Sequence, residues 1–406
     1  MSLPESKVTW SREIVFIFAA TFLAYSSISL FFFYYEYLRT LHIDPRSFGL
    51  LISVFSAVSL LARPIVSPFF HRGNAYRYLA FGTLMLAATL AAYSLASEFW
   101  EMFAVRSFHG LSFVILGAAL MTITVEYVPQ GRSAQFFGFI SIIVLIPNTL
   151  IPPILPFLTH ALGGFTRVLL LFGAITLLVL PLVRLAGSAG PSPHSMKASQ
   201  RPSGKEILTN IKDVPVVLVL LAMLFLYSAY ALVFFFLDGF GKEIGILKTG
   251  LFLTLATIGE IAVRVFGGAF FDKTDKIRLA FFTMLGLCLA YAVLGRIKGS
   301  GAFFPLGLLL GLGWGIAMPV FNGLMFDISR PAMRAFNTNL GFQMFQGGFF
   351  LGPFAGAPIV SRWGYGLLFD ACALASLISA VLLLCLKGTI KCDGGNKTLN
   401  SVLENR

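Results

Sequence analysis

The chain alternates long apolar runs with short polar breaks over almost its whole length. A bilayer core is about 30 Å thick and takes roughly 20 apolar residues per helix. Runs of that length predict helices that span a membrane, because a helix satisfies its own backbone hydrogen bonds. The predicted spans are residues 13–38, 47–70, 78–97, 101–127, 134–158, 165–186, 214–238, 248–271, 279–296, 302–327, 335–360 and 366–387. The pattern therefore predicts an all-α polytopic membrane protein with twelve transmembrane helices.

The composition agrees with this prediction and narrows the function. Of the 406 residues, 57% are hydrophobic and 12% are charged, whereas soluble domains are about 45–50% apolar and about 25% charged. No large soluble domain fits between the spans. The four cysteines have no metal-binding spacing, and no HExxH motif or phosphate-binding loop is present. We therefore expect no enzyme activity, no metal and no cofactor.

The distribution of charge predicts the orientation in the membrane. The formal net charge of +12 raises the question of a nucleic-acid partner, but basic residues gather in the cytoplasmic loops of membrane proteins. Most Lys and Arg residues fall on one side if both termini are cytoplasmic. We expect a plasma-membrane protein, or an inner-membrane protein in a bacterium, with no nucleic-acid partner.

One longer polar segment divides the spans into two groups of six. Residues 187–213 are rich in Ser, Pro and Gly and predict a flexible cytoplasmic linker. The predicted organisation is a cytoplasmic N-terminus, a six-helix bundle, the linker, a second six-helix bundle and a cytoplasmic tail. The corresponding ranges are 1–12, 13–186, 187–213, 214–387 and 388–406.

The two halves repeat one another at an offset of about 200 residues. Four matches occur in the same order along both halves, which points to an internal duplication of the kind found in transporters. The matched features are Tyr25-Ser26 with Tyr227-Ser228, Arg63 to Arg72 with Arg264 to Lys273, Pro129 and Arg132 with Pro331 and Arg334, and Asn148-(x)3-Pro152-Pro153 with Gly348-(x)3-Gly352-Pro353.

Three motifs resemble those of the major facilitator superfamily over about residues 12–387. They are Gly268-(x)3-Asp272-Lys273, Arg106-(x)2-His109-Gly110 and Gly348-(x)3-Gly352-Pro353-(x)2-Gly356. The second motif has His where the family usually has Gln, and the third lies in the eleventh span rather than the fifth. The resemblance implies two six-helix bundles that work by alternating access as a monomer, with the substrate bound near the membrane midplane.

Glu260 and Arg264 are the first candidate pair for substrate binding and coupling. They stand four residues apart on one predicted helix and so share a face. Burial disfavours the charged carboxylate and Arg264 favours it, so proton loading and substrate binding would compete. Two alternatives stay open: a self-neutralising structural pair, and recognition of a substrate carboxylate by Arg264.

Arg106 and His109 are the second candidate pair. Arg106 has no acidic residue three or four positions away, so it needs a partner from another helix or an anionic substrate. By resemblance, the corresponding family arginine serves proton coupling, and a structural bond to the first helix is an equal alternative. His109 is either a proton relay or a core hydrogen-bond donor.

Several polar residues lie on spans that the resemblance places around the central cavity. Asn339, Gln343 and Gln346 fall on one helical face, and the third, sixth and ninth spans have almost no polar residues beyond Ser and Thr. Polar contacts between packed helices are the alternative. The candidate residues are Tyr25, Tyr227, Tyr230, Asn322, Asn339, Gln343 and Gln346.

A second set of residues predicts a gate at the cytoplasmic ends of the helices. We expect Asp272 near the N-terminus of the fifth span, with Arg132 close by, because a carboxylate is favourable at a helix N-terminus. This contact would stabilise an outward-open state. The gating candidates are Asp272, Lys273, Arg132, Arg63, Arg72, Gly268, Gly352 and Pro353.

The sequence as a whole predicts a secondary active transporter for a small organic solute. Three arginines against one clear acid within the spans favour an anionic or zwitterionic substrate, and Glu260 indicates proton coupling. One alternative is a proton antiporter that exports drugs or metabolites from an aromatic pocket. An alternative of another class is a lipid translocator or a membrane sensor that does not transport.

Overall fold

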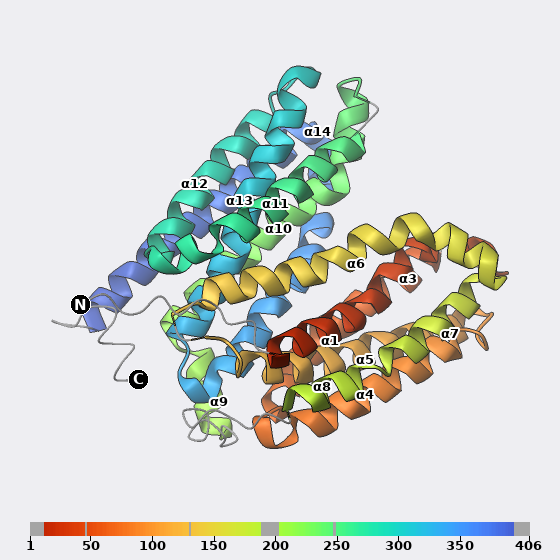
Figure 1. The fold of residues 1–406 in the computed structure, drawn as a ribbon. Helices are drawn as coiled ribbons and strands as arrows, with labels where there is room; N and C mark the ends of the chain where they lie inside the picture. Colours follow the sequence, from red (N-terminus) through yellow and green to blue (C-terminus); the bar gives the residue numbers. More distant parts are fainter. Residues whose placement is uncertain (1–11, 45–46, 130, 188–202, 247–248, 394–406) are drawn as a thin grey trace. The chain divides into compact units, whose positions relative to one another are not determined.

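The computed structural model describes residues 12–44, 47–129, 131–187, 203–246 and 249–393, and these are helical apart from short connections, with no strand (Figure 1). Ten of the helices are long and apolar enough to cross a membrane. Each predicted span overlaps a helix in this part of the chain. The all-α membrane fold expected from the apolar runs is therefore confirmed.

The chain divides into two compact units. The first consists of residues 1–129 and 140–201, and the second consists of residues 130–139 and 202–406. The first turns of the fifth predicted span thus group with the second unit, although the linker was expected to mark the division.

The first unit is built from pairs of long helices, among which α4 packs on α5 and α7, α3 packs on α5, and α1 packs on α8. Its helices are α1 (Arg12–Ser29), a 3-10 turn (Leu30–Phe33), α2 (Tyr34–Arg39), α3 (Phe48–Val66), α4 (Arg72–Ala92), α5 (Phe99–Val125), α7 (Phe165–Thr176) and α8 (Val179–Gly187). The helix α6 (Ser133–Leu162) begins among residues of the second unit and continues in the first.

In the second unit, α10 packs along α14, and α13 packs on α11 and α12. Its helices are α9 (Gly204–Ile211), α10 (Val214–Glu243), α11 (Thr249–Lys273), α12 (Lys276–Leu294), α13 (Ser300–Ile328) and α14 (Arg334–Asp393). Gly364 interrupts α14 with φ +78° and ψ −179°, a conformation that glycine adopts readily. The last two predicted spans therefore lie on either side of this interruption.

The duplication seen in the sequence has a counterpart in how helices pack. In the first unit a Cβ on Gly110 would lie 2.8 Å from the carbonyl oxygen of Phe55. In the second unit a Cβ on Gly311 would overlap the carbonyl oxygen of Ala256. Both residues of the second pair stand 201 positions after those of the first. The same glycine contact thus joins α3 to α5 and α11 to α13.

The linker region contains a short helix that the sequence did not predict. Helix α9 occupies Gly204–Ile211, inside the segment expected to be a flexible connection. Ser203 caps it, and Glu206 completes a reciprocal capping box. Residues 188–202 of the predicted linker lie outside the described part of the chain.

Candidate functional site

The second unit buries an ion pair on α11. The Nη2 atom of Arg264 lies 2.8 Å from Oε2 of Glu260, and the two residues are 2% and 3% exposed. Arg264 Nη2 also lies 3.4 Å from the sulfur of Met318 on α13. The spacing of four residues brought the two charges to one face, as the sequence predicted. Glu260 is therefore held next to its counter-charge inside the unit.

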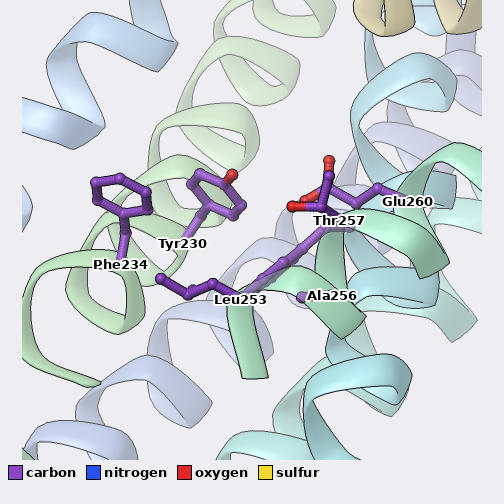
Figure 2. Close-up of a pocket in the computed structure, with 7 residues that line it drawn as sticks. Tyr230, Phe234, Leu253, Ala256, Thr257 and Glu260 are labelled. Carbon is purple, nitrogen blue, oxygen red and sulfur yellow. The ribbon is translucent and has the colours of Figure 1, made fainter. Parts of the chain in front are cut away.

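A small cavity borders Glu260 (Figure 2). Its volume is about 40 Å³, which is room for a few water molecules, since one water needs roughly 10–15 Å³. Binding sites for organic molecules measure about 300–1,000 Å³, so this cavity suits water or a proton rather than a whole solute. Its lining is Tyr230, Phe234, Leu253, Ala256, Thr257, Glu260 and Trp314.

Aromatic rings continue from this cavity along α10 and α14. The ring of Tyr230 meets Trp314 edge-on, with centroids 4.6 Å apart. Tyr227 meets Phe345 edge-on at 5.3 Å, and Phe345 lies 4.5 Å from Phe349. Edge-on and tilted rings of this kind pack favourably. The two predicted tyrosines thus belong to one aromatic cluster within the second unit.

In the first unit, Arg106 is enclosed by aromatic rings. Its guanidinium carbon lies 4.2 Å, 4.6 Å and 4.8 Å from the ring centres of Phe31, Tyr34 and Phe55. The side chain is 5% exposed, and within the described residues it has no ion pair with a carboxylate. Cation–π contacts with buried rings stabilise such a charge. The predicted lone arginine therefore has aromatic partners.

His109 joins Arg106 to the end of α4. Its Nδ1 atom lies 3.3 Å from Nη1 of Arg106 and 3.3 Å from the hydroxyl of Tyr93. The imidazole is fully buried, and its Nε2 has no hydrogen-bond partner in the structure. Since arginine only donates, Nδ1 accepts the bond from Arg106. The structure thus brings the two predicted residues of α5 together.

A third buried arginine, Arg63, lies near the end of α3. It lies beside the hydroxyl of Tyr25, and a Cβ on Gly117 would lie 3.2 Å from its Nη2. Arg264 and Met318 occupy the positions 201 residues later and are also in contact. Both halves therefore bury an arginine against the same point of the neighbouring helix. Among the residues that the structure describes, a carboxylate joins the arrangement only in the second half.

The predicted amides lie in the second unit, and all but Gln346 are buried. Asn322 donates to the backbone oxygen of Met318 at 2.8 Å and lies beside the hydroxyl of Tyr227. Asn339 donates to the oxygen of Ala335 at 3.0 Å. Gln343 is buried, and Gln346 is half-buried. Asn322 and Asn339 thus each bond to a backbone oxygen of their own helix, and these bonds are not the contacts between packed helices that the sequence left open as the alternative.

Asp272 lies at the N-terminus of α6. Its two carboxylate oxygens accept hydrogen bonds from the backbone N–H groups of Ala134 and Gln135 at 2.9 Å and 2.8 Å. Because the first N–H groups of a helix have no partner within it, a carboxylate there is stabilised by both hydrogen bonds and the helix dipole. Gly268, one turn earlier, allows the side chain of Gln135 to approach α11.

The cation beside Asp272 is Lys276. Its Nζ lies 2.9 Å from Asp272 and 3.0 Å from Asp327 at the end of α13. Arg132, which was expected close to Asp272, immediately precedes α6, and the described residues show no ion pair between the two. Lys276 therefore connects the start of α12 to the ends of α11 and α13.

The other gating candidates are more scattered. Arg72 pairs with Glu126 at 3.1 Å. Lys273 is exposed. A Cβ on Gly352 would lie 3.0 Å from the oxygen of Ser228, so this glycine permits close packing on α10. The side chain of Pro353 lies outside the described part of the structure.

The comparisons with known proteins decide the family. The family model of the Major Facilitator Superfamily matches residues 17–353. The chain belongs to the major facilitator superfamily. The resemblance drawn from its three motifs is therefore confirmed. A search of curated proteins by sequence finds no match.

Solved structures of superfamily transporters share this fold. The human organic anion transporter MFSD10 is 16% identical and covers 93% of this chain and 100% of its own, with a TM-score of 0.70. FucP in the outward conformation is 13% identical and covers 92% and 98%, with a TM-score of 0.74. The proton:xylose symporter XylE is 11% identical and covers 92% and 94%, with a TM-score of 0.70. At these identities the likeness establishes the fold alone.

Sequence reasoning missed several residues that complete these contacts in the superfamily member. Lys276 could have been found, because it stands four residues after Asp272. Tyr93, Trp314 and Met318 reach their partners from other helices. Among apolar neighbours these three carry no signal that distinguishes them from ordinary core residues.

Proposed function

We propose that this superfamily transporter moves small organic anions or zwitterions by alternating access and couples their movement to protons. The proposal is supported by which charged side chains are buried. Among the described residues the buried charged side chains are Arg63, Arg106, Glu260 and Arg264. A buried charge is costly unless it has a partner. The excess of arginine favours a negatively charged solute.

Glu260 is the proposed proton site. It is buried, it borders a cavity large enough for water, and Arg264 is its counter-charge. Protonation of Glu260 would release Arg264 to bind the carboxylate of a substrate, whereas loss of the proton would restore the ion pair. Substrate and proton would thus be linked through one arginine.

Two structural relatives are consistent with the two parts of this proposal. MFSD10 is described as an organic anion transporter, and XylE is described as a proton:xylose symporter. They make anion transport and proton coupling reasonable functions to test in this chain.

A thermal-shift screen of purified protein tests the substrate class. The panel contains organic anions, organic cations, sugars and neutral drugs at two pH values. A ligand at 100 times its dissociation constant adds about 2.7 kcal/mol to stability. The control variant is Arg278→Gln, because Arg278 is largely exposed on α12. The proposal is supported if anions stabilise the unsubstituted protein and Arg278→Gln but do not stabilise Arg264→Gln.

The aromatic cluster favours a second candidate function. Tyr227, Tyr230, Phe345, Phe349 and Trp314 offer apolar surface without charge. Such surface would suit export of bulky drugs or metabolites in exchange for protons. In the same screen, stabilisation by apolar compounds alone, equal in both arginine variants, would favour this exporter over the anion transporter.

The contact of Asp272 with α6 is proposed as the gate. It ties the start of α6 to α11 through two backbone hydrogen bonds, and its loss would free these helix ends to separate. We propose that it stabilises the outward-open state. We also propose that both termini are cytoplasmic, that the protein acts in the plasma membrane and that it works as a monomer.

A further inference from the structure

Helix α9 (Gly204–Ile211) is anchored to the second unit by one side. Asn210 and Asn337 exchange hydrogen bonds through their side-chain amides at 2.6 Å and 3.1 Å, and Asn337 also donates to Oγ of Ser329 at 2.8 Å. Ile207 packs against a small cluster that includes Phe336. The anchoring side of α9 thus contacts the start of α14 and the end of α13.

The acidic residue of α9, Glu206, interacts with groups of the protein itself. Glu206 accepts a hydrogen bond from the backbone N–H of Ser203 at 2.6 Å. This bond lowers the pKa of its carboxyl, and the positive charge of Arg330 lowers it further. The negative charge of Glu206 is therefore stabilised by Ser203 and Arg330.

The exposed surface of α9 is apolar and basic. Leu208 and Ile211, three residues apart, are 56% and 47% exposed. Lys205 and Lys212 stand seven residues apart, which is two helical turns, and both are exposed. Neither lysine forms an ion pair within the described residues. An apolar face bordered by lysines is the pattern of a helix that lies in a membrane interface.

The position of α9 along the chain identifies what covers this face. The membrane-spanning part of α10 begins at Val214, three residues after α9 ends. This short distance keeps α9 at the membrane boundary. We propose that α9 binds the bilayer surface, with Leu208 and Ile211 at the headgroup boundary and the two lysines on anionic lipid headgroups.

The anchor makes this lipid contact relevant to the transporter. The same helix that faces the bilayer is hydrogen-bonded to Asn337 in the first turn of α14. Anionic lipid would therefore fix α9 and, through Asn210, the start of α14. This inference does not depend on the substrate or on proton coupling.

A spin label measures the depth of α9 directly. The label is placed at position 208 in a chain whose cysteines are replaced, and the protein is reconstituted into nanodiscs of phosphatidylcholine with increasing phosphatidylserine. Collision with oxygen reports the membrane, and collision with a nickel chelate reports water. We expect the label at 208 to enter the membrane as phosphatidylserine rises, and a label at Lys298, which is exposed on a different connection, to stay in water.

The lysine variants test the charge recognition. A lysine near an anionic surface contributes about 1 kcal/mol, which is about fivefold in affinity. Lys205→Gln with Lys212→Gln should therefore weaken the phosphatidylserine dependence on the order of 25-fold. Lys242→Gln with Lys298→Gln, exposed on connections predicted to face the other side, should leave it unchanged. A label at 208 that stays in water in every lipid, or a depth that is independent of phosphatidylserine, would overturn the proposal.

Discussion

The guanidinium of Arg264 lies 2.8 Å from the carboxylate of Glu260, one turn earlier on α11. Both side chains are almost completely buried. In the first half of the chain the corresponding arginine, Arg63, lies beside the hydroxyl of Tyr25. Around these two arginines, the second half has the carboxylate of Glu260 next to Arg264, and the proposed coupling depends on that carboxylate.

The energy of this pair predicts an unequal effect of single and double substitutions. Removing one partner of a buried ion pair typically costs about 3–5 kcal/mol, because the other charge is left uncompensated. Glu260→Ala should therefore lower the melting temperature strongly, and Glu260→Ala with Arg264→Met should recover much of the loss. Thermal unfolding in detergent measures both. A double variant less stable than Glu260→Ala would contradict this account of the pair.

The Asp272 contact predicts a change in conformational balance. Asp272→Asn removes the negative charge from the N-terminus of α6 and weakens both backbone hydrogen bonds. We expect the population to shift away from the outward-open state, measured by alkylation of a single cysteine near one membrane face. Asp275→Asn is the control, because Asp275 caps α12. Equal alkylation in Asp272→Asn and the unsubstituted chain would count against the gate.

The glycine contact between α11 and α13 predicts a packing defect. In Gly311→Ala the new methyl group would overlap the carbonyl oxygen of Ala256, so the helices must separate and the melting temperature should fall. Gly286→Ala on α12 is the matched control, because no atom lies within 4 Å of its added Cβ. Alanine exceeds glycine in helix propensity by about 1 kcal/mol, so the control should be neutral or stabilising. Equal melting temperatures in the two variants would refute the packing argument.

The aromatic enclosure of Arg106 predicts that lysine cannot replace it. A planar guanidinium stacks on rings, whereas an ammonium is compact and strongly hydrated. Arg106→Lys keeps the charge but should destabilise the first unit by about 1–2 kcal/mol. Thermal unfolding checks this value, with Arg278→Lys at a largely exposed position as the control. Full stability of Arg106→Lys would show that the contacts with Phe31, Tyr34 and Phe55 contribute little.

Local sequence spacing predicted those features that depend on one helix. The spans follow from their apolar length, and Glu260 and Arg264 follow from a spacing of four residues. Contacts between helices did not follow, because the sequence gives no distance between Tyr93 and His109 or between Lys276 and Asp327. Helix α9 was missed because its eight residues lie in a polar segment, and its docking depends on Asn337, more than 120 positions away.

Transport into proteoliposomes tests proton coupling most directly. The solute is the anion that gives the largest thermal shift, and uptake is measured with and without an imposed pH gradient. Glu260→Gln is compared with Glu243→Gln, whose residue is exposed at the end of α10. We predict that Glu260→Gln still exchanges solute across the membrane but no longer accumulates it when a pH gradient is imposed. Accumulation driven by the pH gradient in Glu260→Gln, at the rate of the control, would contradict the account.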